Sequence, residues 1–148
     1  MQRVVHIAKA TGMYGMEKHL LALLPALQNR FHISCVVLFE RTKPVDVYLN
    51  LLRSSDVAVF PIPIAHDVDP RTLAAVAAVL RRLRPALVHT HLIHGDCYGI
   101  AAAAITGCRC IVATRHNDDA FRRRLPVRLL SRLLAARVRT LIAISDWV

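Results

Sequence analysis

Short apolar runs alternate along the chain with longer segments whose apolar residues recur at helical spacing. The first run spans residues 3–8 and leads into a turn that contains Gly12 and Gly15. A short, mainly apolar and β-branched run is typical of a strand buried on both faces of a sheet. From Met16 onward, apolar residues at positions 16, 20, 23, 24 and 27 instead predict an amphipathic helix. The chain therefore begins with a buried strand followed by a helix.

The same alternation continues to the end of the sequence. Further strands are predicted at 33–39, 57–60, 86–91, 109–114 and 140–144, and further helices at 44–53, 70–84, 96–106 and 126–136. The helix at 70–84 has the clearest ends, because Asp69 can cap it, Pro70 fits its first turn and Pro85 stops it. Such alternation implies right-handed crossovers. We therefore expect an α/β fold, a Rossmann-like doubly wound parallel sheet with helices on both faces.

The composition agrees with a single well-packed domain. The chain has 148 residues, of which 55% are hydrophobic and 20% charged. A chain of this length corresponds to about one domain, and so apolar a composition excludes intrinsic disorder. No repeat of solenoid length and no low-complexity linker interrupts the sequence. Residues 1–148 are thus expected to form one domain.

The cysteines and the start of the sequence favour a cytoplasmic location. The four cysteines form no CxxC pair, and residues 1–20 lack the pattern of a signal peptide. We therefore interpret them as free thiols. No stretch reaches the roughly 18 consecutive apolar residues that a membrane span needs. Any membrane contact is expected to be peripheral, on the inner membrane face.

Polar residues follow four of the predicted strands. These segments are residues 11–17, 91–96, 115–119 and 145–146. In an open parallel sheet, ligands bind outside the carboxyl ends of the strands, above all where the strand order reverses. We therefore expect the binding site at this edge of the sheet.

The first of these segments resembles an anion-binding turn. It lacks the three glycines of a dinucleotide fingerprint and the Gly-Lys-Ser/Thr of a P-loop. The backbone N–H groups of Gly15 and Met16 nevertheless fall at a predicted helix N-terminus, where a phosphate can be bound. A simple tight turn between strand and helix explains the same residues, and this alternative stays open.

Three histidines alternate in the run His89-Thr90-His91-Leu92-Ile93-His94. Two histidines two apart on a strand share one face, which suggests a metal-dependent hydrolase with an HxHxDH motif. However, Ile93 stands where that motif needs Asp, and no further ligand spacing follows. We therefore expect no metal. His89 is expected to pack within the sheet, while His91 and His94 line the binding edge and face His116.

Residues 115–148 carry eight Arg and three Asp, which is half of the net charge of +10. The arginines of interest are Arg122, Arg123, Arg124, Arg128 and Arg132, interspersed with leucines. Such a helix suits an anionic membrane surface. A solvated basic face whose leucines join the core is the alternative. Nucleic acid is not expected as a partner, because the segment offers only Phe121 and Trp147 for stacking.

Four motifs together resemble a known family. They are GMYGMEKHLL at 12–21, RPALVHTH at 84–91, ATRHN at 113–117 and AISD at 143–146. In order and spacing they are similar to the N-terminal domain of retaining GT-B glycosyltransferases of family 4. The resemblance covers nearly the whole chain. It departs from the family at Tyr14, which stands where a second adjacent glycine is usual.

The resemblance implies transfer of a sugar, with retention, from a nucleotide-sugar donor to a sugar, lipid-linked or polysaccharide acceptor. No cofactor is implied besides the donor. Gly12, Gly15 and Met16 would hold the donor diphosphate, and His91 would act as the catalytic residue facing the reacting sugar. The acceptor side of the cleft would be formed by His94, His116, Asn117 and Asp118.

The end of the sequence bears on the same expectation. Ser145 and Asp146 look like the start of a helix. We therefore expect a C-terminal donor-binding domain beyond this chain, and little activity from the chain alone. A non-enzymatic nucleotide- or phosphate-binding α/β module is the alternative function, and a metal-dependent hydrolase comes third.

Overall fold

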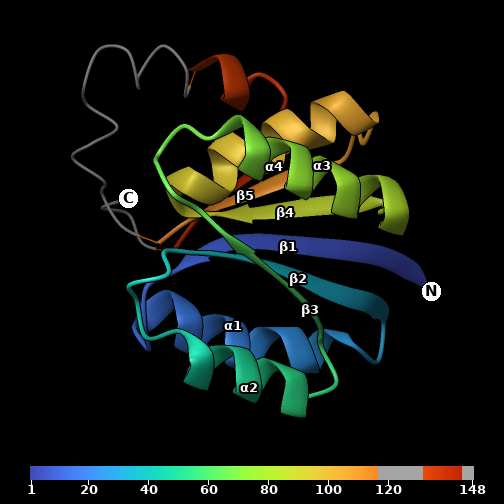
Figure 1. Ribbon diagram of the computed structural model, residues 1–148. Helices are drawn as coiled ribbons and strands as arrows, with labels where there is room; N and C mark the ends of the chain where they lie inside the picture. Colours follow the sequence, from blue (N-terminus) through green and yellow to red (C-terminus); the bar gives the residue numbers. More distant parts are fainter. Residues whose placement is uncertain (117–131, 145–148) are drawn as a thin grey trace.

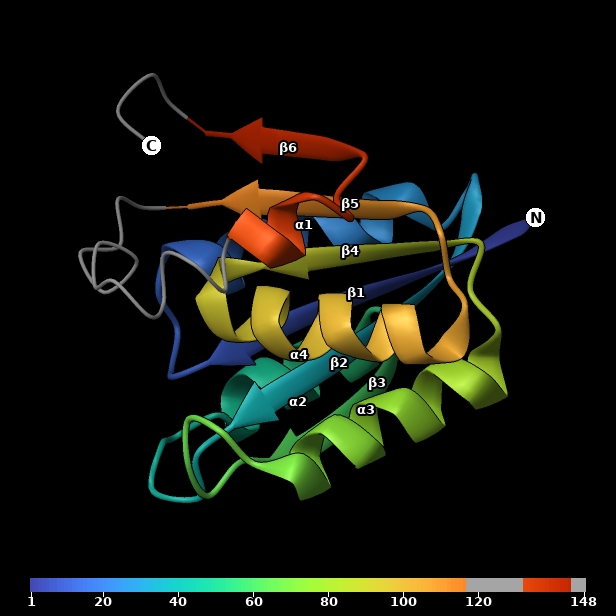
Figure 2. The same cartoon turned by 90° about the horizontal axis from the view of Figure 1, so that it is seen from above.

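The structure is a computed structural model that describes residues 1–116 and 132–144. Within these residues, six strands form one parallel sheet. The strands are β1 (Gln2–Ala10), β2 (Phe31–Phe39), β3 (Ala58–Pro63), β4 (Leu87–His91), β5 (Ile111–Arg115) and β6 (Thr140–Ala143). They lie in the order β3-β2-β1-β4-β5-β6, and each neighbouring pair is parallel. Figure 2 shows β1, β4, β5 and β6 running side by side toward the same edge.

Four long helices cover the two faces of this sheet. They are α1 (Gly15–Leu27), α2 (Asp46–Ser54), α3 (Pro70–Leu83) and α4 (Leu92–Thr106). In Figure 1, α1 and α2 lie on one face of the sheet and α3 and α4 on the other. The three-layer, doubly wound arrangement predicted from the alternating pattern is therefore confirmed.

Each face of the sheet carries its own apolar core, and β1 contributes to both. Val5 and Ile7 join the core under α3 and α4, whereas Val4 and Ala8 join the core under α1 and α2. Successive side chains of a strand point to opposite faces. A central parallel strand is therefore apolar on both faces, which explains the largely apolar run at the start of the sequence, interrupted at His6.

The order of the strands reverses between β1 and β4. From β1 the chain continues outward through β2 to β3, then returns to the other side of β1 and continues through β4 and β5 to β6. The loops that leave β1 and β4 therefore diverge toward opposite faces at their carboxyl ends. A crevice opens at such a switch point, and it is where ligands bind in open α/β sheets.

The predicted helix ends are largely confirmed. The Asp69 carboxylate accepts a hydrogen bond from the Arg71 N–H at 2.9 Å and so caps α3. At the other end of α3, Arg84 adopts a left-handed conformation with φ 46°. Gly107 ends α4 with φ 78°, a conformation that glycine adopts without strain.

One boundary prediction is wrong: α4 begins at Leu92, not near Asp96. Strand β4 ends at His91, and the chain enters the helix at once through Leu92, whose φ is 61°. Residues 92–95 therefore form the first turn of a helix rather than a loop. No local signal predicts this early start, because a left-handed leucine is unusual.

Part of the predicted basic helix at 126–136 lies outside the described residues. Within the described part, residues 132–135 form a helical turn that is followed by β6. Leu134 and Val138 pack against the core under α3 and α4. No helix among residues 1–116 and 132–144 is long and apolar enough to cross a membrane.

Helix α4 lies unusually close to the sheet, because glycines face β1 and β4. A Cβ atom on Gly95 would lie 2.6 Å from the carbonyl oxygen of Ile7, and one on Gly99 would lie 2.6 Å from Cγ2 of Thr90. Backbone cannot move aside as a flexible side chain can. The depth at which α4 packs, and hence the position of its first turn, depends on these glycines.

We expect Gly95→Ala to lower the free energy of unfolding by about 1–3 kcal/mol, because the added methyl group forces α4 away from β1. Urea denaturation followed by circular dichroism would measure the change. Gly15→Ala is the matched control, since a Cβ there would meet nothing within 4 Å. Equal midpoints for the wild type and Gly95→Ala would show that α4 does not depend on this contact.

Candidate functional site

A cavity of about 450 Å³ opens at the switch point between β1 and β4. Residues of the β1–α1 loop, the first turn of α4 and the end of β5 line it: Lys9, Thr11, Tyr14, Gly15, Met16, Glu17, Leu92, Ile93, His94 and His116. The structure thus brings three of the four predicted polar segments to one site, as expected for the carboxyl edge of a parallel sheet; the fourth, at residues 145–146, lies outside the described part of the chain.

The loop that leaves β1 is held in place by Glu17. This carboxylate is buried and accepts hydrogen bonds from the backbone N–H groups of Thr11 at 2.9 Å and Tyr14 at 3.3 Å. Hydrogen bonds to a charged acceptor are stronger than those between neutral groups. Glu17 therefore fixes the shape of the loop that forms one wall of the cavity, a role that we did not predict from the sequence.

Of the three predicted phosphate-binding residues, two line the cavity and one does not. Gly15 and Met16 line the cavity at the first turn of α1, and the space where a Gly15 side chain would lie is open. Gly12 is buried instead, and a Cβ on it would lie 2.9 Å from the Tyr14 ring. The N–H groups in the first turn of a helix lack intrahelical partners and favour an anion. This wall can therefore bind a phosphate group.

A chain of histidines extends from the cavity into the protein. His116 lines the cavity, and its Nε2 lies 3.1 Å from Nδ1 of His91. Nε2 of His91 lies in turn 3.0 Å from Nδ1 of His6 on β1. His91 is completely buried and uses both ring nitrogens in this chain. The residue expected to face a sugar therefore lies behind His116.

Burial keeps these histidines uncharged. Desolvation lowers the pKa of His6 and of His91 well below the ordinary value, and it lowers the pKa of His89 to about 4. The pKa of His116 is also lowered, again chiefly by desolvation. At neutral pH each ring therefore carries a single proton and can donate one hydrogen bond and accept another.

His89 packs within the sheet, in line with its predicted structural role. Its Nε2 lies 2.7 Å from the Thr114 hydroxyl on β5, and its ring stacks on His91 with centroids 4.3 Å apart. His6, His89 and His91 each place a ring nitrogen within 4.8 Å of the others. His6 was missed from the sequence, because only the pairing of β1 with β4 brings it to the other histidines.

His94 belongs to the cavity wall as predicted, although it lies on the first turn of α4. Its Nε2 is 2.9 Å from Oδ1 of Asp67, and this hydrogen bond lowers the pKa of the Asp67 carboxyl. Asp67 was not foreseen.

Arg132 is exposed on the helical turn at 132–135. Predicted residues outside the described part of the chain are Asn117, Asp118, Arg122, Arg123, Arg124 and Arg128.

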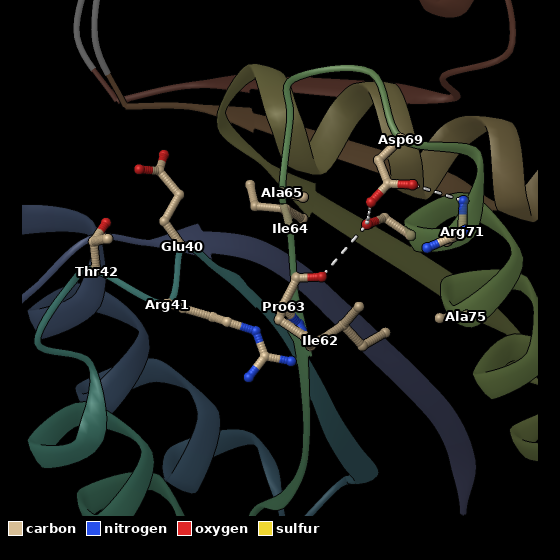
Figure 3. A pocket seen from close by; sticks show the side chains of 11 residues that line it. Glu40, Arg41, Thr42, Ile62, Pro63, Ile64, Ala65, Asp69, Arg71 and Ala75 are labelled. Atoms are coloured by element: carbon tan, nitrogen blue, oxygen red, sulfur yellow. Dashed lines mark hydrogen bonds between the residues drawn. The ribbon is translucent and has the colours of Figure 1, made fainter.

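A second cavity, of about 540 Å³, lies farther along the same edge, beyond β2 and β3. Figure 3 shows Arg41, Asp69 and Arg71 around it. Within its lining, the Thr72 hydroxyl lies 3.1 Å from Asp69 Oδ2, and Asp69 caps α3. The Lys9–Glu40 ion pair, with 2.6 Å between its atoms, has one residue in each cavity lining. Of the two cavities, the one at the switch point gathers the predicted residues.

Comparison with known proteins links this arrangement to one family. A family model described as Glycosyltransferase Family 4 matches residues 13–148. No curated protein has a significantly similar sequence.

Solved structures share the fold at low sequence identity. Anabaena Alr3699/HepE, solved with UDP, has a TM-score of 0.73 at 16% identity, over 97% of this chain and 38% of that chain. MurG of Acinetobacter baumannii has a TM-score of 0.61 at 15% identity, over 97% of this chain and 41% of that chain. UDP-GlcNAc 2-epimerase of Methanocaldococcus jannaschii has a TM-score of 0.66 at 10% identity, over 97% and 40% respectively. The fold is that of a Rossmann-like GT-B domain, and the chain spans about two fifths of the length of these proteins.

Replacing Glu17 by Ala should lower the free energy of unfolding by about 2–3 kcal/mol, because two backbone N–H groups lose a charged, buried acceptor. Thermal or urea denaturation would measure the loss. Lys18→Ala is the matched control, one residue along α1 and exposed, and it should change stability by less than about 0.5 kcal/mol. Similar effects of the two substitutions would contradict the role given to Glu17.

Proposed function

The chain belongs to Glycosyltransferase Family 4, and on that basis we propose that it is the acceptor-side domain of an enzyme that transfers a sugar from a nucleotide-sugar donor to an acceptor with retention. The observation that carries the proposal is the cavity at the switch point, where a helix N-terminus faces two histidines across one opening. Such a site can bind a phosphate group and a hydroxyl-rich ligand side by side.

The first turn of α1 would bind the diphosphate of the donor. Gly15 and Met16 present backbone N–H groups there, and the open space at Gly15 lets a phosphate oxygen approach the backbone. Negative charge grows on the diphosphate as the bond to the sugar breaks. Backbone N–H groups that already point toward this charge lower the barrier, because no reorganisation is needed during the reaction.

The histidines would bind the sugar hydroxyls. His116 and His94 reach the cavity directly, and Asn117 and Asp118 follow His116 in the chain. Neutral imidazoles suit this task, because they both donate and accept hydrogen bonds without attracting the anionic leaving group. We assign His91 as the catalytic residue. Its contact with the reacting sugar requires the His116 ring to turn aside, which would free Nδ1 of His91.

Donor selection would be the task of a second domain. HepE, MurG and the epimerase are each about two and a half times as long as this chain, which matches 38–41% of their lengths. We propose that the remaining length supplies the donor-binding domain, and that the site is complete only when the two domains face each other.

A transfer assay tests this assignment. We expect the 148-residue chain to release almost no nucleoside diphosphate from a panel of nucleotide sugars, and a longer protein with a donor-binding domain to release it readily. In that longer protein, His91→Ala should lower kcat/KM by about 100-fold. The exposed strand residue His32 offers the control His32→Gln, which should leave the rate unchanged.

Two results would contradict this proposal. Rapid transfer by the 148-residue chain alone would show that no second domain is needed. A product whose anomeric configuration is inverted, as read by NMR, would show that retention is wrong.

Peripheral membrane binding is the second part of the proposal. It is supported by the sequence alone, in which arginines repeat at positions 124, 128 and 132 among leucines. Like charges at this spacing weaken a helix unless an anion neutralises them. A surface of anionic lipid would do so and would place the enzyme beside a lipid-linked acceptor.

Vesicle sedimentation tests the membrane contact. We expect the chain to sediment with vesicles of anionic lipid and not with those of neutral lipid, because the attraction is electrostatic. The double change Arg124→Glu and Arg128→Glu should abolish binding. Arg81→Glu with Arg82→Glu alters the charge equally on the exposed end of α3 and should not. Equal loss in both variants would indicate attraction by net charge alone, and unchanged binding in both would remove the proposed contact.

A further inference from the structure

Three imidazoles converge between the sheet and the α1 side of the domain. His6 on β1 and His89 and His91 on β4 each place a ring nitrogen within 4.8 Å of the others. We propose that these residues form a binding site for a divalent transition-metal ion of the zinc type. The site shares His91 with the proposed sugar contact, but binding of the ion is measured without substrate and is therefore tested separately from sugar transfer.

The sheet itself defines the positions of the three ligands. His6 and His89 are directly paired in the parallel register of β1 and β4, and His91 follows two residues after His89. Residues paired across neighbouring strands, and residues two apart on one strand, point to the same face. All three imidazoles therefore project from two hydrogen-bonded strands, which form a more rigid support than loops provide.

The spacing of the nitrogens is close to that of metal ligands. Nδ1 of His6 lies 3.0 Å from Nε2 of His91. Zinc bonds histidine nitrogen at about 2.0–2.1 Å in tetrahedral geometry, which places two ligand nitrogens roughly 3.3 Å apart. The pair therefore needs to widen by a few tenths of an ångström, and both rings must turn so that their lone pairs converge on the ion. His89, within 4.8 Å of the other two ligands, closes the remaining distance by a small shift that keeps its Nε2 on the Thr114 hydroxyl.

Metal binding requires no net release of protons. The two neutral rings share one N–H between Nδ1 of His6 and Nε2 of His91. With the ion at these two atoms, the protons reside on Nε2 of His6 and Nδ1 of His91. Nδ1–H of His91 then donates to Nε2 of His116, 3.1 Å away. Metal-bound histidines commonly donate their second N–H in this way, and such partners fix the ring orientation.

The three ligands differ in their surroundings. Nε2 of His6 is buried without a hydrogen-bond partner among the described residues, whether Nδ1 of the same ring faces His91 or an ion. His89 is half-buried and is oriented by the Thr114 hydroxyl at 2.7 Å. His89 is therefore the most exposed of the three ligands, and a water molecule would be the fourth ligand of the ion.

Ligand chemistry selects the class of ion. Imidazole nitrogen suits zinc, cobalt, nickel and copper, whereas magnesium, calcium and manganese prefer oxygen ligands. Cobalt(II) is therefore a suitable probe, because it occupies zinc sites and its visible spectrum reports both coordination number and ligand type.

The experiment is a titration of the chelator-treated 148-residue chain with cobalt(II). We expect one equivalent to bind, with the strong visible bands of four-coordinate cobalt, without a thiolate charge-transfer band, and with displacement by zinc. His89→Gln should weaken binding at least tenfold through loss of a ligand. Thr114→Val, which keeps the shape of the side chain, should weaken it by roughly tenfold because the ring of His89 loses its orienting partner.

Histidines outside the cluster provide the controls. His94→Gln removes the histidine that pairs with Asp67, and His32→Gln removes a histidine exposed on β2; neither should change the titration. Thermal unfolding of each variant without metal checks that it is folded. The proposal is overturned if folded His89→Gln and Thr114→Val bind cobalt as the wild type does, if a thiolate band appears, or if the wild type does not bind.

Discussion

The pairing of β1 with both β2 and β4 is the constraint on which the rest of the structure depends. Because the two neighbours are reached by crossovers in opposite directions, the chain reverses at β1 and a crevice opens beside its carboxyl end. The same pairing places His6 opposite His89. The position of β4 beside β1 thus creates both the cavity and the histidine cluster behind it.

The close packing of α4 is the second requirement. Gly95 and Gly99 let this helix approach the backbone of β1 and the side chain of Thr90 more closely than any other residue would allow. The helix can therefore start directly after β4, with His94 on the cavity wall and His91 underneath. The depth of the helix thus places His94 at the cavity, while His91 stays buried behind His116.

The sequence was informative where the signal is periodic and local. Buried strands, the Asp69 cap and the Gly107 stop were all predictable, because each depends on neighbouring residues. The start of α4 was not, since nothing local marks a left-handed Leu92. His6 and Asp67 were missed for another reason: their partners are 85 and 27 residues away in sequence, and only the order of the strands brings them together. The sheet edge and the loops that form the candidate site were therefore predictable from the sequence, but the hydrogen bonds that link its side chains were not.

Electrostatic effects connect the cavity with the cluster of His6, His89 and His91 behind it. The net charge of +10 contributes little at the cavity, because Lys9 is paired with Glu40 and the histidines are held neutral by burial. An anion bound there, as proposed, would depend mainly on backbone N–H groups and the positive end of α1. A divalent ion among His6, His89 and His91 would add positive charge behind His116 without changing the cavity wall. The metal and the phosphate would then stabilise each other's binding, each by the same factor, as linkage requires.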